Sequence, residues 1–139
     1  MRLICLALAL IPSALLADPP DNAPALPLST PLSAAEFDAY ATGKTLSFAL
    51  GGLVWGSEQY LPGHQVLWAF TGQTCEFGQW YEDQGAICFV YEGKHDANCW
   101  YFYRGATGLR AQFLGGSSRL SEVGQTPEPM NCAGPQVGT

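Results

Sequence analysis

The chain has 139 residues, a length typical of one domain, and carries 6 Lys and Arg against 12 Asp and Glu, a net charge of −6. This acidic balance disfavours nucleic acid as a partner, because nucleic-acid binding needs basic residues that neutralise phosphates.

Residues 1–17 are typical of a secretory signal peptide, because Arg2 precedes an apolar run, Leu3–Leu16, that ends just before a polar, Pro-rich segment. The run is too short for a membrane span, which needs about 20 residues. A buried N-terminal helix is the alternative. Removal of the segment leaves 122 residues with a net charge of −7. We therefore expect a periplasmic or secreted protein without a transmembrane span in the mature chain.

Residues 18–31 contain five prolines and predict a disordered leader.

A short helix is predicted from residue 34 to about residue 42. Ser33 and Glu36 have the spacing of a capping box, and Gly43 is a typical helix stop. The helix has one apolar stripe, headed by Phe37. We expect this stripe to pack on a sheet or to close one end of a barrel.

From residue 44 onward, short runs rich in Val, Ile, Phe, Tyr and Trp alternate with Gly-containing turns, which predicts strands throughout. Short connections make consecutive strands antiparallel neighbours. We predict an all-β, eight-stranded antiparallel meander that forms a small closed or partly open barrel, with an open sheet or a two-sheet sandwich as alternatives. The tail from residue 124 is not expected to be a strand, so residues 32–139 form a single β-rich domain with a C-terminal tail. The predicted strands are 45–50, 53–61, 64–70, 75–81, 86–91, 99–104, 109–114 and 119–123.

The stretch Thr74–Arg104 contains three of the five cysteines and predicts three consecutive antiparallel strands. Its turns place Trp80 opposite Ile87, and Cys88 opposite Cys99, although a one-residue slip would invert a strand. Indoles then point inward and sulfurs outward. The inward set is bulky and predicts a packed interior or a narrow cavity: Leu46, Phe48, Val66, Trp68, Phe70, Trp80, Ile87, Phe89, Trp100, Phe102, Leu109, Ala111 and Phe113.

Four cysteines remain if Cys5 is removed with the signal peptide, and an even number in an exported chain predicts two disulfides. Three pairings are possible. The strand register favours Cys88–Cys99, which leaves Cys75–Cys132 to hold the tail. A zinc site is the competing interpretation, but spacings of 12, 10 and 32 residues contain no Cys-x-x-Cys pair.

Catalytic motifs are not found in the chain: it has no phosphate-binding Gly-rich loop, no His-Glu-x-x-His and no Gly-x-Ser-x-Gly. His64 follows a Pro-Gly turn, and His95 lies in a charged hairpin tip; both are expected to be solvated. We therefore predict that the protein is not an enzyme and has no catalytic residues, metal or cofactor.

Aromatic residues predicted on the outer face form a candidate binding surface, since exposed Tyr and Trp are enriched at interfaces. The alternative is that the helix and tail cover them. Arginines on the last strands, including Arg119, offer a further possibility, a small anion as ligand. The candidate surface consists of Trp55, Tyr81, Tyr91, Tyr101, Tyr103, Arg104 and Arg110.

Several short sequence patterns lie between residues 60 and 100, and the most specific of them are Gly78-x-Trp80 and Ile87-Cys88-Phe89 followed by Cys99-Trp100. In these patterns the chain resembles an uncharacterised family of small secreted alphaproteobacterial proteins, over residues 32–138. The resemblance implies a bacterial periplasmic or extracellular protein, and implies no activity and no site residues.

The first functional hypothesis is a non-catalytic periplasmic or secreted interaction module, expected to be a monomer, whose partner is an unknown protein or envelope component. The alternatives are a lipocalin-like carrier of a small apolar ligand and an inhibitor of a periplasmic hydrolase. A continuous apolar pocket of several hundred Å³ would favour the carrier. A filled interior with an exposed aromatic patch would favour the interaction module.

Overall fold

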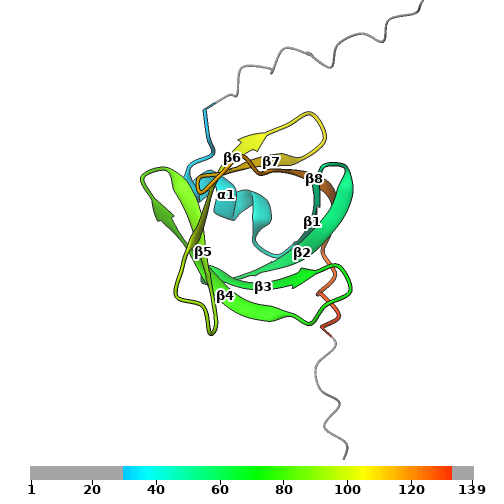
Figure 1. The fold of residues 1–139 in the computed structure, drawn as a ribbon. Helices are drawn as coiled ribbons and strands as arrows, with labels where there is room; N and C mark the ends of the chain where they lie inside the picture. Colours follow the sequence, from blue (N-terminus) through cyan, green and yellow to red (C-terminus); the bar gives the residue numbers. More distant parts are fainter. Residues whose placement is uncertain (1–29, 133–139) are drawn as a thin grey trace, which may run out of the picture.

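The computed structural model describes residues 30–132, so the predicted signal peptide, nearly all of the predicted leader and the end of the tail lie outside the described residues. The described chain is a closed antiparallel barrel of eight strands, in which every strand pairs with its sequence neighbours and β8 pairs with β1 (Figure 1). The predicted all-β meander is confirmed, and it is closed rather than an open sheet or sandwich.

Within the described residues, one helix precedes the strands, and it has the predicted position. Helix α1 spans Ala34–Ala41, and Thr42 is its C-cap. The strands are β1 (Thr45–Leu50), β2 (Leu53–Leu61), β3 (Gln65–Phe70), β4 (Glu76–Asp83), β5 (Ala86–Tyr91), β6 (Asn98–Arg104), β7 (Leu109–Phe113) and β8 (Arg119–Thr126).

Helix α1 closes one end of the barrel (Figure 1). Its start is fixed by the predicted capping box, in which Ser33 and Glu36 exchange side-chain to backbone hydrogen bonds. Phe37 is fully buried and its ring lies 4.5 Å from the ring of Phe102 and 5.3 Å from that of Trp80, between ring centroids. The helix thus fills the barrel interior at this end and leaves the other end to be formed by loops.

The hairpin between β4 and β5 corrects one predicted register. Its turn is the two residues Gln84 (φ 49°) and Gly85 (φ 83°), both with the positive φ that a type I′ hairpin turn requires. Trp80 therefore pairs with Phe89, and the prediction that it lies opposite Ile87 is wrong. The difference is two residues, so each side chain keeps its predicted face. Every residue of the predicted inward set belongs to the core or packs against it.

Strand β8 is longer than predicted. Its last three residues, Gly124–Thr126, pair with Ser47, Leu46 and Thr45 of β1, so the prediction that the chain is not a strand from residue 124 is wrong for these residues. Pairing with β1 supplies their backbone groups with hydrogen bonds, which a Gly-rich composition does not prevent.

Both predicted disulfides are present. Cys88 and Cys99 are direct partners on β5 and β6, with their Cα atoms 4.0 Å apart. Cys75 and Cys132 are 57 residues apart in sequence and join the segment after β8 to the start of β4. A hydrogen bond of 3.0 Å from the Met130 amide to the Gln59 side chain also holds this segment against β2.

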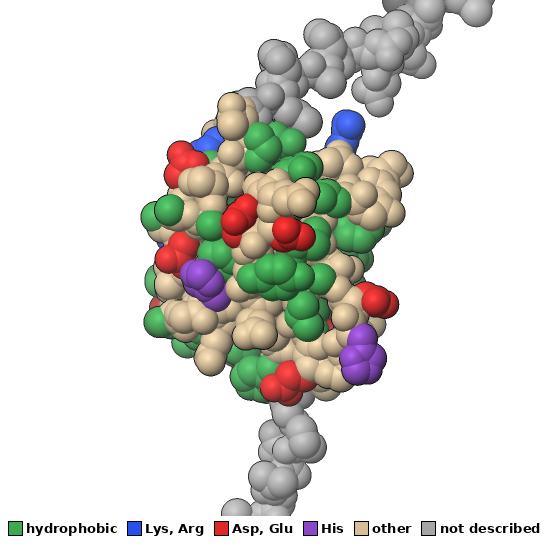
Figure 2. All heavy atoms as spheres, turned by 90° about the vertical axis from the view of Figure 1, so that its left-hand side faces the viewer, with side chains coloured by type: hydrophobic (Ala, Val, Ile, Leu, Met, Phe, Trp, Pro, Cys, Tyr) green, Lys and Arg blue, Asp and Glu red, His purple; other side chains and the backbone are tan. Residues whose placement is uncertain are grey.

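The outer surface carries scattered large apolar side chains, among them Phe77 at 55% exposure and Tyr81 at 43%. Figure 2 shows one side of the molecule, where hydrophobic side chains lie among acidic ones and both histidines are exposed. In the described part of the chain, no helix has the length and apolar character needed to cross a membrane.

Candidate functional site: an aromatic cavity with a buried carboxyl group

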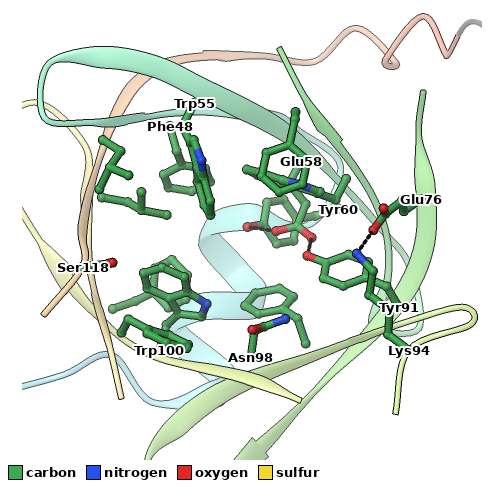
Figure 3. A pocket seen from close by; sticks show the side chains of 17 residues that line it. Phe48, Trp55, Glu58, Tyr60, Glu76, Tyr91, Lys94, Asn98, Trp100 and Ser118 are labelled. Carbon is green, nitrogen blue, oxygen red and sulfur yellow. Dashed lines mark hydrogen bonds and ion pairs between the residues drawn. The ribbon is translucent and has the colours of Figure 1, made fainter. Parts of the chain in front are cut away.

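The barrel interior contains a cavity of about 330 Å³ at the end opposite α1 (Figure 3). Strand order places the β1–β2, β3–β4, β5–β6 and β7–β8 connections around this end. Tyr60, Phe89 and Phe102, which contact Phe37 of the helix, lie at the inner end of the cavity. The lining is dominated by aromatic side chains, among them Trp55, Trp68, Phe70, Trp100 and Phe113.

Glu58 of β2 is the buried polar group of this cavity, with only 4% of its surface exposed. The hydroxyl of Tyr60 donates to one carboxyl oxygen at 2.8 Å, and that of Tyr91 donates to the other at 2.7 Å (Figure 3). Burial raises the pKa of Glu58 to about 7, while the bonds from Tyr91 and Tyr60 act in the opposite direction. Near neutral pH the carboxyl group therefore exchanges readily between its charged and neutral forms.

Both tyrosines that contact Glu58 remain neutral hydrogen-bond donors. Burial, and then the nearby carboxyl group, raise the pKa of Tyr60 and of Tyr91 above the usual value. Their hydroxyls are directed to the carboxyl group, and the arrangement connects β2 with β5 through the barrel interior.

The walls beside Glu58 are formed by packed aromatic rings. The ring of Trp55 lies 5.3 Å from that of Trp68 and 5.1 Å from that of Phe70, and the ring of Trp100 lies 4.8 Å from that of Phe113. Trp68 lies directly over Gly56, where a Cβ atom would be 2.5 Å from the indole. The absence of a side chain at Gly56 thus allows the Trp68 indole to occupy its place in the wall.

The mouth of the cavity carries one ion pair. Lys94 and Glu76 are 2.6 Å apart and partly exposed, and the Lys94 ammonium is 5.7 Å from the ring centroid of Tyr91 (Figure 3). Because Lys94 is paired with Glu76, Glu58 has no cationic partner among the residues that the structure describes.

The structure changes the interpretation of two predicted surface residues. Trp55 was expected on the outside, but it lines the cavity because it is the extra residue of a β-bulge: Phe48 pairs with Gly56, whereas Ala49 pairs with Val54. Tyr91 shares the inward face of Phe89 and reaches Glu58. Both predictions of an outward position are wrong.

The other predicted surface residues remain on the outside of the barrel. Tyr81 is exposed, and Tyr101 and Tyr103 are half-buried on the face opposite Trp100. Arg110 is exposed and pairs with Tyr103 across the β6–β7 ladder, while Arg104 lies over the ring of Tyr40 at 4.6 Å. The structure therefore brings Trp55 and Tyr91 together in the cavity and separates them from the remaining tyrosines and arginines.

Histidines take no part in the cavity. His95 is exposed in the loop before β6, as expected. His64 is also exposed, but its ring stacks on that of Trp80 with 3.8 Å between centroids, a contact that the expected solvated turn residue would not make. Within residues 30–132, no group of three or more His, Cys, Asp or Glu is arranged to hold a metal ion.

Sequence reasoning missed the two central residues of the site, Glu58 and Tyr60, because it assigned no inward residues to β2. The available signal was the alternation of Gly56, Glu58 and Tyr60 along one face of a predicted strand.

Comparisons with protein-family models, with curated proteins and with solved structures find no match to this chain.

Proposed function

We propose that the protein is a carrier or binding protein for a small ligand, which it holds inside the barrel. The observation that supports this function is the cavity of about 330 Å³, whose walls are mainly aromatic and whose mouth lies at the end opposite the helix. Ligand sites are typically concave and apolar with a few polar groups that orient the ligand, and eight-stranded barrels are wide enough to hold one small molecule. Glu58 and Tyr91 are among the polar residues that line this cavity.

The proposed location is an oxidising compartment, either the periplasm or the exterior of a bacterial cell. Two disulfides support it, since such bonds persist mainly outside the reducing cytosol. The signal-peptide pattern of residues 1–17 and the resemblance to secreted proteins support it further. Export of a tagged full-length chain, followed by mass measurement before and after reduction, tests the location and the number of bridges.

Interaction through the outer surface is a weaker proposal than ligand binding in the cavity. The outer tyrosines lie on two strands that are not neighbours, β4 and β6, and of the outer tyrosines and arginines only Tyr103 and Arg110 are direct ladder partners.

The prediction that the protein is not an enzyme remains a prediction. Glu58 bears on it, because Glu58 is a buried carboxyl group beside a cavity, with a pKa of about 7, and such groups also serve as general bases. Recovery of chemically unchanged ligand from the cavity would favour the carrier over an enzyme.

Titration with ω-phenylalkyl alcohols of one to four chain carbons tests the proposed function. Trp55 and Trp100 line the cavity, so binding is expected to change tryptophan fluorescence. Asn98 lies at the mouth, and Asn98→Trp places a bulky ring there. Arg110→Trp adds the same ring on the outer face and is the matched control.

Loss of binding in Asn98→Trp, with binding retained in Arg110→Trp, would support the cavity as the site. The proposal is wrong if none of the alcohols binds to the folded wild-type protein and no small molecule accompanies the protein purified from the periplasm. It is also wrong if both Trp variants bind as well as the wild type.

A further inference from the structure

We propose that the cavity selects small organic cations, namely ammonium compounds with an aromatic or aliphatic body, through the Glu58 carboxylate and the aromatic rings around it. This inference rests on the proposed function and names the class of ligand for the same site. It goes beyond the small apolar ligand expected from the sequence, because the structure adds an acidic group to the apolar walls.

Charge at the inner part of the cavity favours a cation over an anion. Glu58 is the buried charged residue that lines the cavity, and the cationic group at the mouth, Lys94, is already paired with Glu76 at 2.6 Å. The two hydroxyls nearest the carboxyl group, those of Tyr60 and Tyr91, both donate to it and are therefore not free to bind an anion. An anionic ligand would meet an uncompensated negative charge in a poorly hydrated site.

Hydrogen-bonding capacity at Glu58 allows a ligand to bind beside the tyrosines. An ionised carboxylate has about four lone-pair directions, and here each oxygen accepts one hydrogen bond from a tyrosine. An ammonium group can donate to a remaining direction and form a charge-assisted hydrogen bond, which is stronger than a neutral one. The tyrosines hold the carboxyl group in place before the ligand arrives.

Aromatic walls supply the second element of cation recognition. The rings of Trp55, Trp68 and Trp100 line the same cavity as Glu58, and the Trp55 ring lies 6.5 Å from that of Trp100. Aromatic faces attract cations, Trp most strongly, and cages of aromatic residues with an acidic group are suited to ammonium ligands. The same rings offer apolar contact to the body of the ligand.

Matched ligands of equal size test the inference. The probes are ω-phenylalkylammonium ions of one to four chain carbons, the corresponding neutral alcohols and the carboxylates, measured by isothermal titration calorimetry at pH 8. The best ammonium ion is expected to bind about 10- to 100-fold more tightly than its alcohol, since one hydrogen bond to a charged group accounts for a factor of that size. The carboxylates are expected to bind least.

Two variants separate charge from folding. Glu58→Gln keeps the size of the side chain and removes its charge, so the preference for ammonium over alcohol is expected to fall to less than about threefold. Glu122→Gln is the control, because Glu122 is also a buried glutamate and accepts a tyrosine hydrogen bond, from Tyr40, but does not line the cavity. This variant is expected to keep the wild-type preference.

The pH dependence of wild-type binding needs no variant and remains informative if Glu58→Gln fails to fold. The groups that face Glu58 are Tyr60 and Tyr91, with the Glu76–Lys94 pair at the mouth. The association constant of the ammonium ion is expected to rise as pH increases from 5.5 through 7 and to level off at about pH 8, whereas that of the alcohol does not rise.

Equal binding of ammonium ion and alcohol in the wild type would overturn the inference and leave the proposed carrier function standing. The inference is also overturned if Glu58→Gln folds and retains the ammonium preference. If no probe of any charge binds, the inference is wrong, and the proposed function is wrong as well when no small molecule accompanies the protein purified from the periplasm.

Discussion

The hydroxyl of Tyr91 donates a hydrogen bond of 2.7 Å to the carboxyl group of Glu58, which connects β5 to β2 inside the barrel. Strands β2 and β5 are not neighbours in the barrel, so this contact joins parts of its wall that the backbone ladders do not join directly. The buried carboxyl group at its centre is expected to affect stability, in addition to its proposed role in ligand choice.

Stability is expected to fall as pH rises through the range in which Glu58 loses its proton. The folded-state pKa of about 7 exceeds the ordinary value of 4.5, so between these values the unfolded chain releases the proton while the folded chain retains it. Below pH 4.5 the group has no effect, and above pH 7 the full loss, at most about 3 kcal/mol, has been reached.

Urea denaturation of wild type and Glu58→Gln at several values between pH 4.5 and 8 measures this effect. The free energy of unfolding of Glu58→Gln is expected to depend less on pH across this window than that of the wild type. Parallel curves for wild type and Glu58→Gln would show that Glu58 titrates normally.

Gly56→Ala is expected to reduce both stability and ligand binding. A Cβ atom at this position would lie 2.5 Å from the Ala69 carbonyl oxygen and 2.5 Å from the Trp68 indole, so the strand or the ring must move. Overpacking of this kind costs about 1–3 kcal/mol. Gly124→Ala, on β8, is the matched control because a Cβ there has no neighbour within 4 Å. Equal unfolding midpoints in urea for the two variants would contradict the expected clash.

The two disulfides are expected to contribute unequally to stability. Cys75–Cys132 closes a loop of 57 residues and Cys88–Cys99 one of 11 residues, for which the loop-entropy model gives about 4 and about 3 kcal/mol. Double substitution of each pair by Ala, followed by chemical denaturation, measures the losses. Cys88 is fully buried, so its variant also loses packing, and a larger loss there would indicate that packing outweighs loop closure.

Phe37→Ala is expected to destabilise the barrel by about 3–5 kcal/mol, because it removes a fully buried ring from the contact between helix and barrel. Phe37→Leu retains most of the volume and should lose less. Thermal unfolding monitored by near-ultraviolet circular dichroism compares the two. A small loss in Phe37→Ala would mean that the helix end of the barrel repacks around the missing ring.

Most of the fold could be predicted from the sequence because its determinants are local. Alternation of apolar residues and the Gly-containing turns define the strands, and the spacing of Ser33 and Glu36 defines the helix start. The disulfides follow from the turn that places Cys88 opposite Cys99. The predicted pairing of β4 with β5 was wrong by two residues. Because side chains alternate between faces with a period of two, this error did not change the face predicted for any side chain.

The residues of the cavity could not be predicted from alternation and turns alone, because a single-residue irregularity occurs near each end of β2. His64 has φ 60° and belongs to the turn before β3, so Tyr60 pairs with the inward residue Val66. A strand that began at His64 would instead have paired Tyr60 with the outward residue Gln65. At the other end of β2, the bulge at Trp55 reverses the alternation again. Each irregularity moves side chains to the other face, and neither has a sequence signature strong enough to locate it.

Helix α1 lies across one end of the barrel and closes the cavity there. A ligand of the proposed kind would therefore have to enter and leave through the same mouth, beside the Glu76–Lys94 pair. Ligand exchange would then be sequential, because a bound ligand must dissociate before the next one can enter the cavity. Under the proposed function, changes in the hairpin loops around this mouth are expected to alter the rate of ligand release without altering the depth at which the ligand is held.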